Sequence, residues 1–209
     1  MPPSSNGRPA ARGRGAAWRR LSEKHQAGAP AEALRLLAAA RAGPLDELDQ
    51  ARAQLLDAQI TFAATRGRDA PALLLEAAKR LDPLDSTLAH ATYLEAFAAA
   101  LSADRLARGG DAREIAAAVL AGDWEPSSQP SPRACRLLMD GLARLTVEGY
   151  TVGAPALREA LRAFRGAQLP EEEELRWLWL ACYIARALGD DRRGMSCDLR
   201  RSTALTLRR

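Results

Sequence analysis

The sequence contains few of the side chains on which enzymes and metal centres depend. Among its 209 residues are only two lysines and two histidines, His25 and His90, which lie far apart with no nearby carboxylate–cysteine grouping. No G-x-x-x-x-G-K-[ST] run occurs, which excludes a Walker phosphate loop, and G-x-S-x-G, H-E-x-x-H and C-x-x-C are also missing. We therefore expect no enzymatic activity, no cofactor and no metal, with the histidines at the surface or in helix packing.

Cysteines and long apolar runs are equally scarce. Cys135, Cys182 and Cys197 form neither a paired framework nor a close-spaced metal set, which suits a reducing cytoplasm. No apolar run approaches the roughly 18 residues that a membrane span needs. The acid-free N-terminus superficially resembles a transit peptide, but its prolines and glycines would break the amphipathic helix that such a peptide requires. The expectation is a cytoplasmic protein without a membrane partner.

The formal charge of +4 comes from the ends of the chain. Residues 1–20 carry five arginines and no acid, and residues 190–209 carry six arginines and three aspartates. The remaining residues, 21–189, hold 19 basic and 23 acidic side chains, a net charge of −4. A nucleic-acid surface needs a basic face on the folded part of a protein. We therefore expect no direct DNA binding.

Aromatic residues make up only 5% of the chain, while alanine and leucine are abundant, which favours helix over sheet. Three similar stretches begin at Ala29, Ala70 and Ala154, each followed by proline and then Ala. Their spacings of 41 and 84 residues place a fourth copy at Ala112, where Arg113 replaces the proline. Four copies at a period of 41 to 42 residues are typical of a stacked helical-repeat protein.

Each copy predicts a short helix, at about 29–41, 70–81, 112–121 and 154–165. The interpretation rests on N-caps, first-turn prolines, stop glycines and an apolar column seven residues into each copy. The caps are Gly28, Asp69, Asp111 and Gly153; the prolines are Pro30, Pro71 and Pro155; the stops are Gly43, Gly122 and Gly166; and the column is Leu36, Ala77, Val119 and Leu161.

Longer helices are expected between the short ones. The 3.6-residue periodicity predicts them at about 48–62, 86–106, 131–148 and 170–188. Two apolar stripes on the first, one through Leu55 and one through Leu56, indicate contacts on two sides. The last is apolar nearly all round, which predicts the most buried helix of the molecule. Residues 124–132 form the longest loop and the expected hinge.

The predicted fold is therefore all-α: a right-handed, tetratricopeptide-like solenoid of about four helix pairs. Residues 1–20 are expected to be a disordered basic tail, residues 21–190 the helical-repeat domain, and residues 191–209 a basic C-terminal tail.

Two tryptophans are candidate partner-binding residues. Trp124, in the predicted loop, either contacts a partner or plugs the end of the third short helix. Trp177 and Trp179 lie on the last helix, where tryptophans usually belong to the core, and Trp177, next to Arg176, is expected to be the more exposed of the two. The acidic run at residues 171–174 is explained by the start of that helix, where negative charge complements the helix dipole.

Several segments together resemble a known family: LLAAARAGPL from Leu36 with the following DEL, RDAP from Arg68 with the following leucines, YLEA from Tyr93, and EEELRWLWLAC from Glu172. They are similar to the helical-repeat region of the large bacterial LuxR-type transcriptional regulators that carry an N-terminal ATPase (MalT-like). The resemblance covers about residues 24–190. In that family, the array lies between an ATPase domain and a helix-turn-helix domain. The resemblance implies that the array senses an inducer or partner and mediates self-association. Neither the phosphate loop nor the helix-turn-helix occurs in this sequence, so ATP and DNA binding do not carry over.

The expected function is a non-enzymatic interaction or sensor module, with a protein or peptide partner on a concave face and self-association as a further expectation. Two alternatives stay open. One is a truncated or frame-shifted regulator fragment without activity of its own, and the other is a small-molecule-binding helical receptor.

Overall fold

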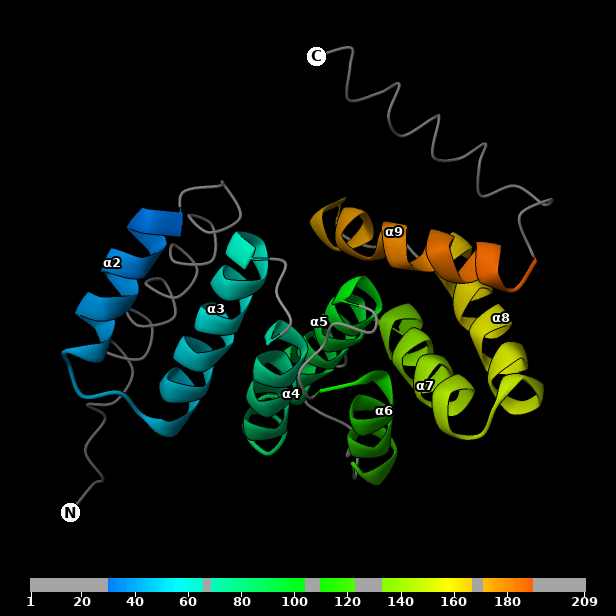
Figure 1. Cartoon of the computed structure of the whole chain (residues 1–209), viewed down its shortest axis with the longest axis horizontal. Helices are drawn as coiled ribbons and strands as arrows, with labels where there is room; N and C mark the ends of the chain where they lie inside the picture. The colour runs from blue at the N-terminus through cyan, green and yellow to red at the C-terminus, as the bar shows by residue number, and fades with distance from the viewer. Residues whose placement is uncertain (1–29, 66–68, 104–109, 123–132, 167–170, 190–209) are drawn as a thin grey trace, which may run out of the picture. The chain divides into compact units, whose positions relative to one another are not determined.

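The structure is a computed structural model that describes residues 30–65, 69–103, 110–122, 133–166 and 171–189. Every regular element in these ranges is an α-helix, which confirms the all-α prediction (Figure 1). The described ranges contain eight helices: α2 (Pro30–Arg41), α3 (Glu47–Thr65), α4 (Ala70–Leu81), α5 (Ser86–Ala103), α6 (Ala112–Ala121), α7 (Arg133–Val147), α8 (Tyr150–Gly166) and α9 (Glu171–Ala187).

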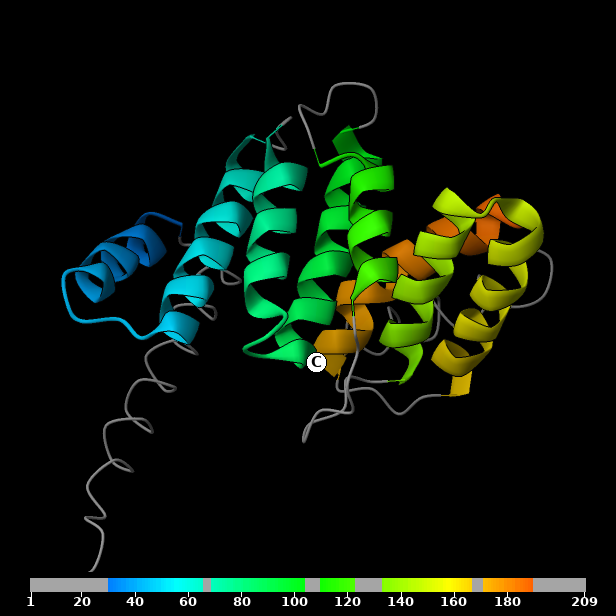
Figure 2. The same ribbon diagram turned by 90° about the horizontal axis from the view of Figure 1, so that it is seen from below.

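The described helices belong to two compact units, Met1–Gly110 and Asp111–Arg209. In the first unit, consecutive helices pack on one another from α2 to α5, and Figure 2 shows α3, α4 and α5 side by side. In the second unit, α6 packs on α7, α7 on α8 and α8 on α9. Four short–long pairs were predicted, and the first three agree with the structure. In the fourth pair, α8 and α9 both have 17 residues. The finer expectation of one tetratricopeptide-like solenoid stays a prediction.

In the first unit, α5 is the helix that is buried on all sides, although α9 was predicted to be the most buried helix. The outer side of α9 is exposed at Trp179 and Tyr183, so that prediction is wrong. The buried residues of α5 are Ala89, His90, Thr92, Tyr93, Leu94, Ala96, Phe97, Ala98, Ala99, Ala100 and Ala103. Most of these side chains are small, and α4 packs closely on α5.

Helix α3 is contacted on two sides, as its two apolar stripes predicted. Leu56 and Ile60 form a cluster with Ala33 and Leu37 of α2. Leu55 is also buried, and α3 packs on α4 as well. This double contact explains why apolar residues cover more than one face of the helix.

The predicted apolar column is correct in three copies and wrong in the first. Ala77, Val119 and Leu161 are buried, whereas Leu36 is 40% exposed. In α2 the buried side chains are Ala33 and Leu37, one position further along the chain. Because one residue turns a helix by about 100°, this shift in register moves Leu36 off the buried face.

In the second unit, α7 and α8 are joined by a tight turn at Gly149. Its φ of +90° lies in the left-handed region that glycine adopts without strain. Gly149 N–H donates to the carbonyl oxygen of Arg144 at 3.2 Å, and Gly153 N–H donates to that of Gly149 at 3.0 Å. Gly149 therefore takes part in the last hydrogen bond of α7 and in the first of α8.

This turn overturns the predicted boundary of the fourth short helix. Helix α8 begins at Tyr150 rather than near residue 154, and Gly153 and Pro155 lie inside it instead of at its cap and first turn. Gly153 has another role: a Cβ built on it would lie 2.3 Å from Leu145 Cα of α7. Likewise, a Cβ on Gly141 of α7 would lie 2.8 Å from Leu157 Cδ2 of α8. Both glycines are needed for close approach of the two backbones.

Aspartate caps start three of the helices. Side-chain oxygens of Asp46, Asp85 and Asp111 each accept a hydrogen bond from the backbone N–H three residues on, at 2.8, 3.0 and 2.9 Å. Each bond satisfies a donor that the helix itself cannot pair. Asp69 occupies the predicted N-cap of α4, but its backbone is helical and its side chain makes no cap hydrogen bond.

Gly153→Ala is expected to lower the free energy of unfolding by about 2 kcal/mol, because a methyl group there meets backbone atoms that cannot rotate aside. This loss outweighs the gain of about 1 kcal/mol in helix propensity. Urea unfolding followed by far-UV circular dichroism measures it. The control is Gly43→Ala, where a Cβ would meet only the carbonyl oxygen of Ala40 at 3.6 Å. Equal stability of the two variants would contradict the close approach of α7 and α8.

The caps at Asp111 and Asp69 form a second matched pair. Asp111→Ala removes the bond to Glu114 N–H and should cost about 1 kcal/mol. Asp69→Ala removes no cap bond and should cost less than about half as much. Scanning calorimetry should show a Tm lower by about 3 °C for the first variant only. A larger loss for Asp69→Ala would show that the caps do not account for the helix starts.

Candidate functional site

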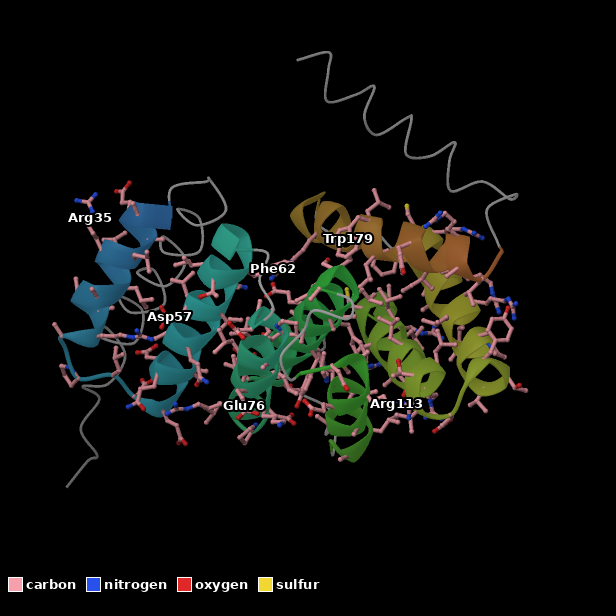
Figure 3. All side chains as sticks on the ribbon, viewed as in Figure 1. Arg35, Asp57, Phe62, Glu76, Arg113 and Trp179 are labelled. Atoms are coloured by element: carbon pink, nitrogen blue, oxygen red, sulfur yellow. The ribbon has the colours of Figure 1, made fainter. Side chains whose placement is uncertain are left out.

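The two tryptophans of α9 point to opposite sides of the helix, and their exposure is the reverse of that expected. Trp177 is 3% exposed, and Trp179 is 46% exposed. Figure 3 labels Trp179 on α9. Trp177 shares the buried face with Leu180, Ala181 and Ile184. Two residues along a helix correspond to a rotation of about 200°, which carries Trp179 to the other side. The candidate Trp177 is therefore a core residue, and the other candidate, Trp124, lies outside the described residues.

Arg176 borders this core. Its guanidinium lies 5.1 Å from the centre of the Trp177 ring, within the range of a cation–π interaction. Burial lowers the pKa of Arg176, although arginine begins so high that it stays charged at neutral pH. The charge beside Trp177, which suggested exposure of this tryptophan, instead lies over its ring.

An exposed aromatic pair occupies the outer side of α9. Tyr183 follows Trp179 by one helical turn and is 44% exposed. Residues four apart on a helix are neighbours on its surface, so the two rings lie on one face. We call Trp179 and Tyr183 the α9 aromatic face. Sequence reasoning missed it because α9 carries apolar residues on nearly every side, which hides the direction of its buried face.

Burial favours the protonated forms of two potential nucleophiles, Cys182 and Tyr93. Burial raises the pKa of the Cys182 thiol, and a protonated thiol is a poor nucleophile. Burial, followed by the negative charges of Asp82 and Glu76, raises the pKa of Tyr93 well above its ordinary value. Within the described ranges, no three His, Cys, Asp or Glu side chains gather as metal ligands would. His90 is buried in α5, in agreement with a packing role.

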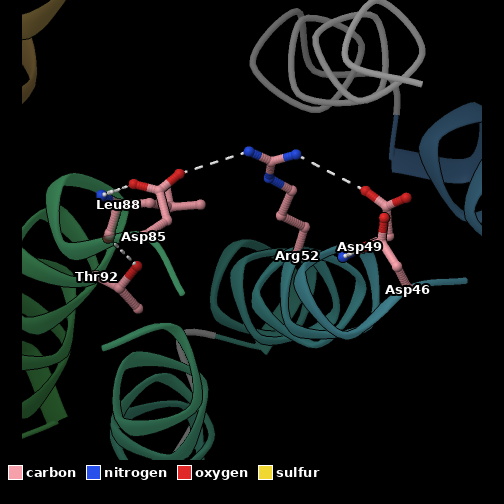
Figure 4. Close-up of polar contacts among 6 residues, drawn as sticks. All are labelled: Asp46, Asp49, Arg52, Asp85, Leu88 and Thr92. Atoms are coloured by element: carbon pink, nitrogen blue, oxygen red, sulfur yellow. Dashed lines mark hydrogen bonds and ion pairs between the residues drawn. The ribbon is translucent and has the colours of Figure 1, made fainter. Parts of the chain in front are cut away.

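The first unit contains a polar network between α3 and the start of α5 (Figure 4). Arg52 lies between two carboxylates, with nitrogen–oxygen distances of 3.7 Å to Asp49 and 3.5 Å to Asp85. Asp49 is only 3% exposed, so the positive charge of Arg52 offsets part of the cost of burying a carboxylate. Asp85 also caps α5. The network therefore ties the α5 cap to α3.

A second polar link joins the same two helices. Gln59 Nε2 of α3 donates to both carboxylate oxygens of Glu95 on α5, at 3.1 and 2.8 Å. Sequence reasoning did not find either link, because the partners lie 33 and 36 residues apart. Both links contribute to the packing of the first unit.

Comparisons with known protein-family models, with curated proteins and with solved structures found no match to the chain. The resemblance to LuxR-type regulators therefore stays a prediction. Among the described residues, no helix combines the length and the apolar character needed to cross a membrane. The α9 aromatic face, with its two exposed rings, is the candidate functional site.

The different surroundings of the two tryptophans can be measured by fluorescence quenching. In variants that keep only one tryptophan, the others being replaced by phenylalanine, acrylamide should quench Trp179 several-fold more strongly than Trp177. The emission of Trp179 should also lie at longer wavelength. Equal quenching constants would contradict the burial of Trp177.

Proposed function

We propose that this chain is a non-enzymatic interaction or sensor module that binds a protein partner through the α9 aromatic face. The observation that carries the proposal is the pair Trp179 and Tyr183, each almost half exposed and one turn apart on the same helix face. Tryptophan and tyrosine are enriched among the residues that dominate binding energy in protein interfaces. Single exposed apolar residues are common on protein surfaces, but two neighbouring aromatic rings give a partner a shared anchor.

The opposite face of α9 supports this role by holding the anchor in place. Trp177, Leu180 and Ile184 are buried, so the helix is packed in the second unit without the help of Trp179 and Tyr183. The aromatic pair is thus available to a partner while the helix keeps its packing. Preorganised side chains bind at lower entropic cost than side chains that must first be ordered.

The link to transcription is part of the proposal and rests on the sequence resemblance alone. On that reading, the module is of LuxR-type regulator ancestry, and its partner is a protein, a peptide or a second copy of the chain. The sequence predicted that the partner binds to a concave face of this chain. The proposal places the binding site on the α9 aromatic face.

The test compares Trp179→Ser/Tyr183→Ser with Leu34→Ser/Leu73→Ser, which removes two similarly exposed apolar residues of the first unit. Proteins captured by the wild-type full-length chain are identified, purified and titrated against each variant. We expect the aromatic double variant to weaken binding about 30-fold, because an aromatic anchor contributes about 2 kcal/mol or more. Self-association is followed with the same variants by sedimentation velocity.

Equal weakening by both double variants would show a general loss of surface hydrophobicity. Unchanged binding and unchanged self-association of Trp179→Ser/Tyr183→Ser would remove the α9 aromatic face from the function. Far-UV circular dichroism of each variant controls for loss of fold.

A further inference from the structure

Helix α8 carries a row of arginines on its outer side. Arg158, Arg162 and Arg165 are exposed and follow one another at intervals of four and three residues, which places them on one helix face. The helical rise puts the first and last about 10 Å apart along the axis. The buried face of the helix, at Ala154, Leu157, Ala160 and Leu161, lies to one side of the row. We call the three residues the arginine row.

The charge of α8 is not balanced within the helix. Its sequence contains three arginines and one carboxylate, Glu159, a net charge of +2. Glu159 is engaged elsewhere, because its Oε1 lies 3.1 Å from Arg133 Nη2 of α7. Arginines one turn apart repel each other and destabilise an isolated helix. The packing of α8 on α7 therefore holds together a row of like charges that the helix alone would not favour.

An exposed apolar corner adjoins the row at the α7–α8 turn. Val147, Tyr150 and Val152 fall within six residues, and Tyr150 is 57% exposed. Arg158 Nη2 donates to the Tyr150 hydroxyl at 3.2 Å, which connects the corner to the first arginine of the row. The positive φ of Gly149 fixes the turn between the two valines. Apolar and positive side chains thus meet on one continuous stretch of α7 and α8.

We propose that the arginine row and this apolar corner form a docking surface for an acidic protein segment with one apolar anchor. A helical segment with carboxylates at i, i+4 and i+7 has the same spacing as the row, since both follow the rise of an α-helix. Arginine pairs with carboxylates in a two-pronged geometry, and the apolar anchor covers the exposed valines. This surface is separate from the α9 aromatic face and does not depend on it.

The apolar corner favours an acidic protein segment over a nucleic acid. The arginines attract both ligands, but only a protein segment carries an aliphatic side chain beside its carboxylates, which can cover Val147 and Val152. A nucleic-acid backbone is a continuous polyanion and offers no aliphatic side chain to this corner.

The test uses a fluorescein-labelled, end-capped, alanine-rich peptide of about twelve residues, with glutamates at i, i+4 and i+7 and a leucine one turn before them. Its glutamine counterpart and an oligo-dT of about the same length serve as comparison ligands. Fluorescence anisotropy at about 0.15 M ionic strength measures binding to the full-length chain. The variants are Arg158→Gln/Arg162→Gln and the charge-matched Arg35→Gln/Arg113→Gln, two exposed arginines on other helices (Figure 3).

We expect the glutamate peptide to bind and Arg158→Gln/Arg162→Gln to weaken it about fivefold or more, since an exposed ion pair changes affinity by up to about fivefold. Arg35→Gln/Arg113→Gln should stay within about twofold of wild type. Equal weakening by both variants, or no preference for glutamate over glutamine, would overturn the proposal. Tighter, row-dependent binding of oligo-dT would overturn it too, in favour of a nucleic acid. Binding that persists in Trp179→Ser/Tyr183→Ser separates this surface from the α9 aromatic face.

Discussion

The second unit depends on how closely the backbones of α7 and α8 approach each other. At two crossing points a glycine of one helix lies against a residue of the other, Gly153 against Leu145 and Gly141 against Leu157. No larger residue fits there without separating the helices. This contact determines which side of α8 faces inward. The arginines of α8 consequently face outward as a group, so a packing constraint determines where the surface charge gathers.

The helix boundaries were largely predictable because they are set by local chemistry. Pro71 lies in the first turn of α4 and Asp111 caps α6, and both helices have the predicted bounds. Apolar periodicity located the longer helices to within a few residues. The failure at α8 is instructive, because Gly153 and Pro155 look like an N-cap and a first-turn proline. A contact with α7, remote from the local signal, gave Gly153 a different role.

The directions of helix faces were harder to predict than the helices themselves. Where apolar residues cover most of a helix, as in α9, periodicity cannot tell which side meets the core. Trp177 was therefore expected to be the more exposed of the two tryptophans, whereas Trp179 is. Leu36 differs from its buried neighbour Leu37 by a single position. The links from Arg52 to Asp85 and from Gln59 to Glu95 join residues more than 30 positions apart, and only the three-dimensional packing brings them together.

The turn at Gly149 also bears on the order in which the chain folds. It joins α7 and α8 through only two residues, and these helices pack on each other more extensively than other neighbouring helices of the described chain. Closing so short a loop costs little chain entropy, and contacts between residues near in sequence form fastest. The α7–α8 hairpin is therefore suited to be the folding nucleus of the second unit, onto which α6 and α9 then assemble.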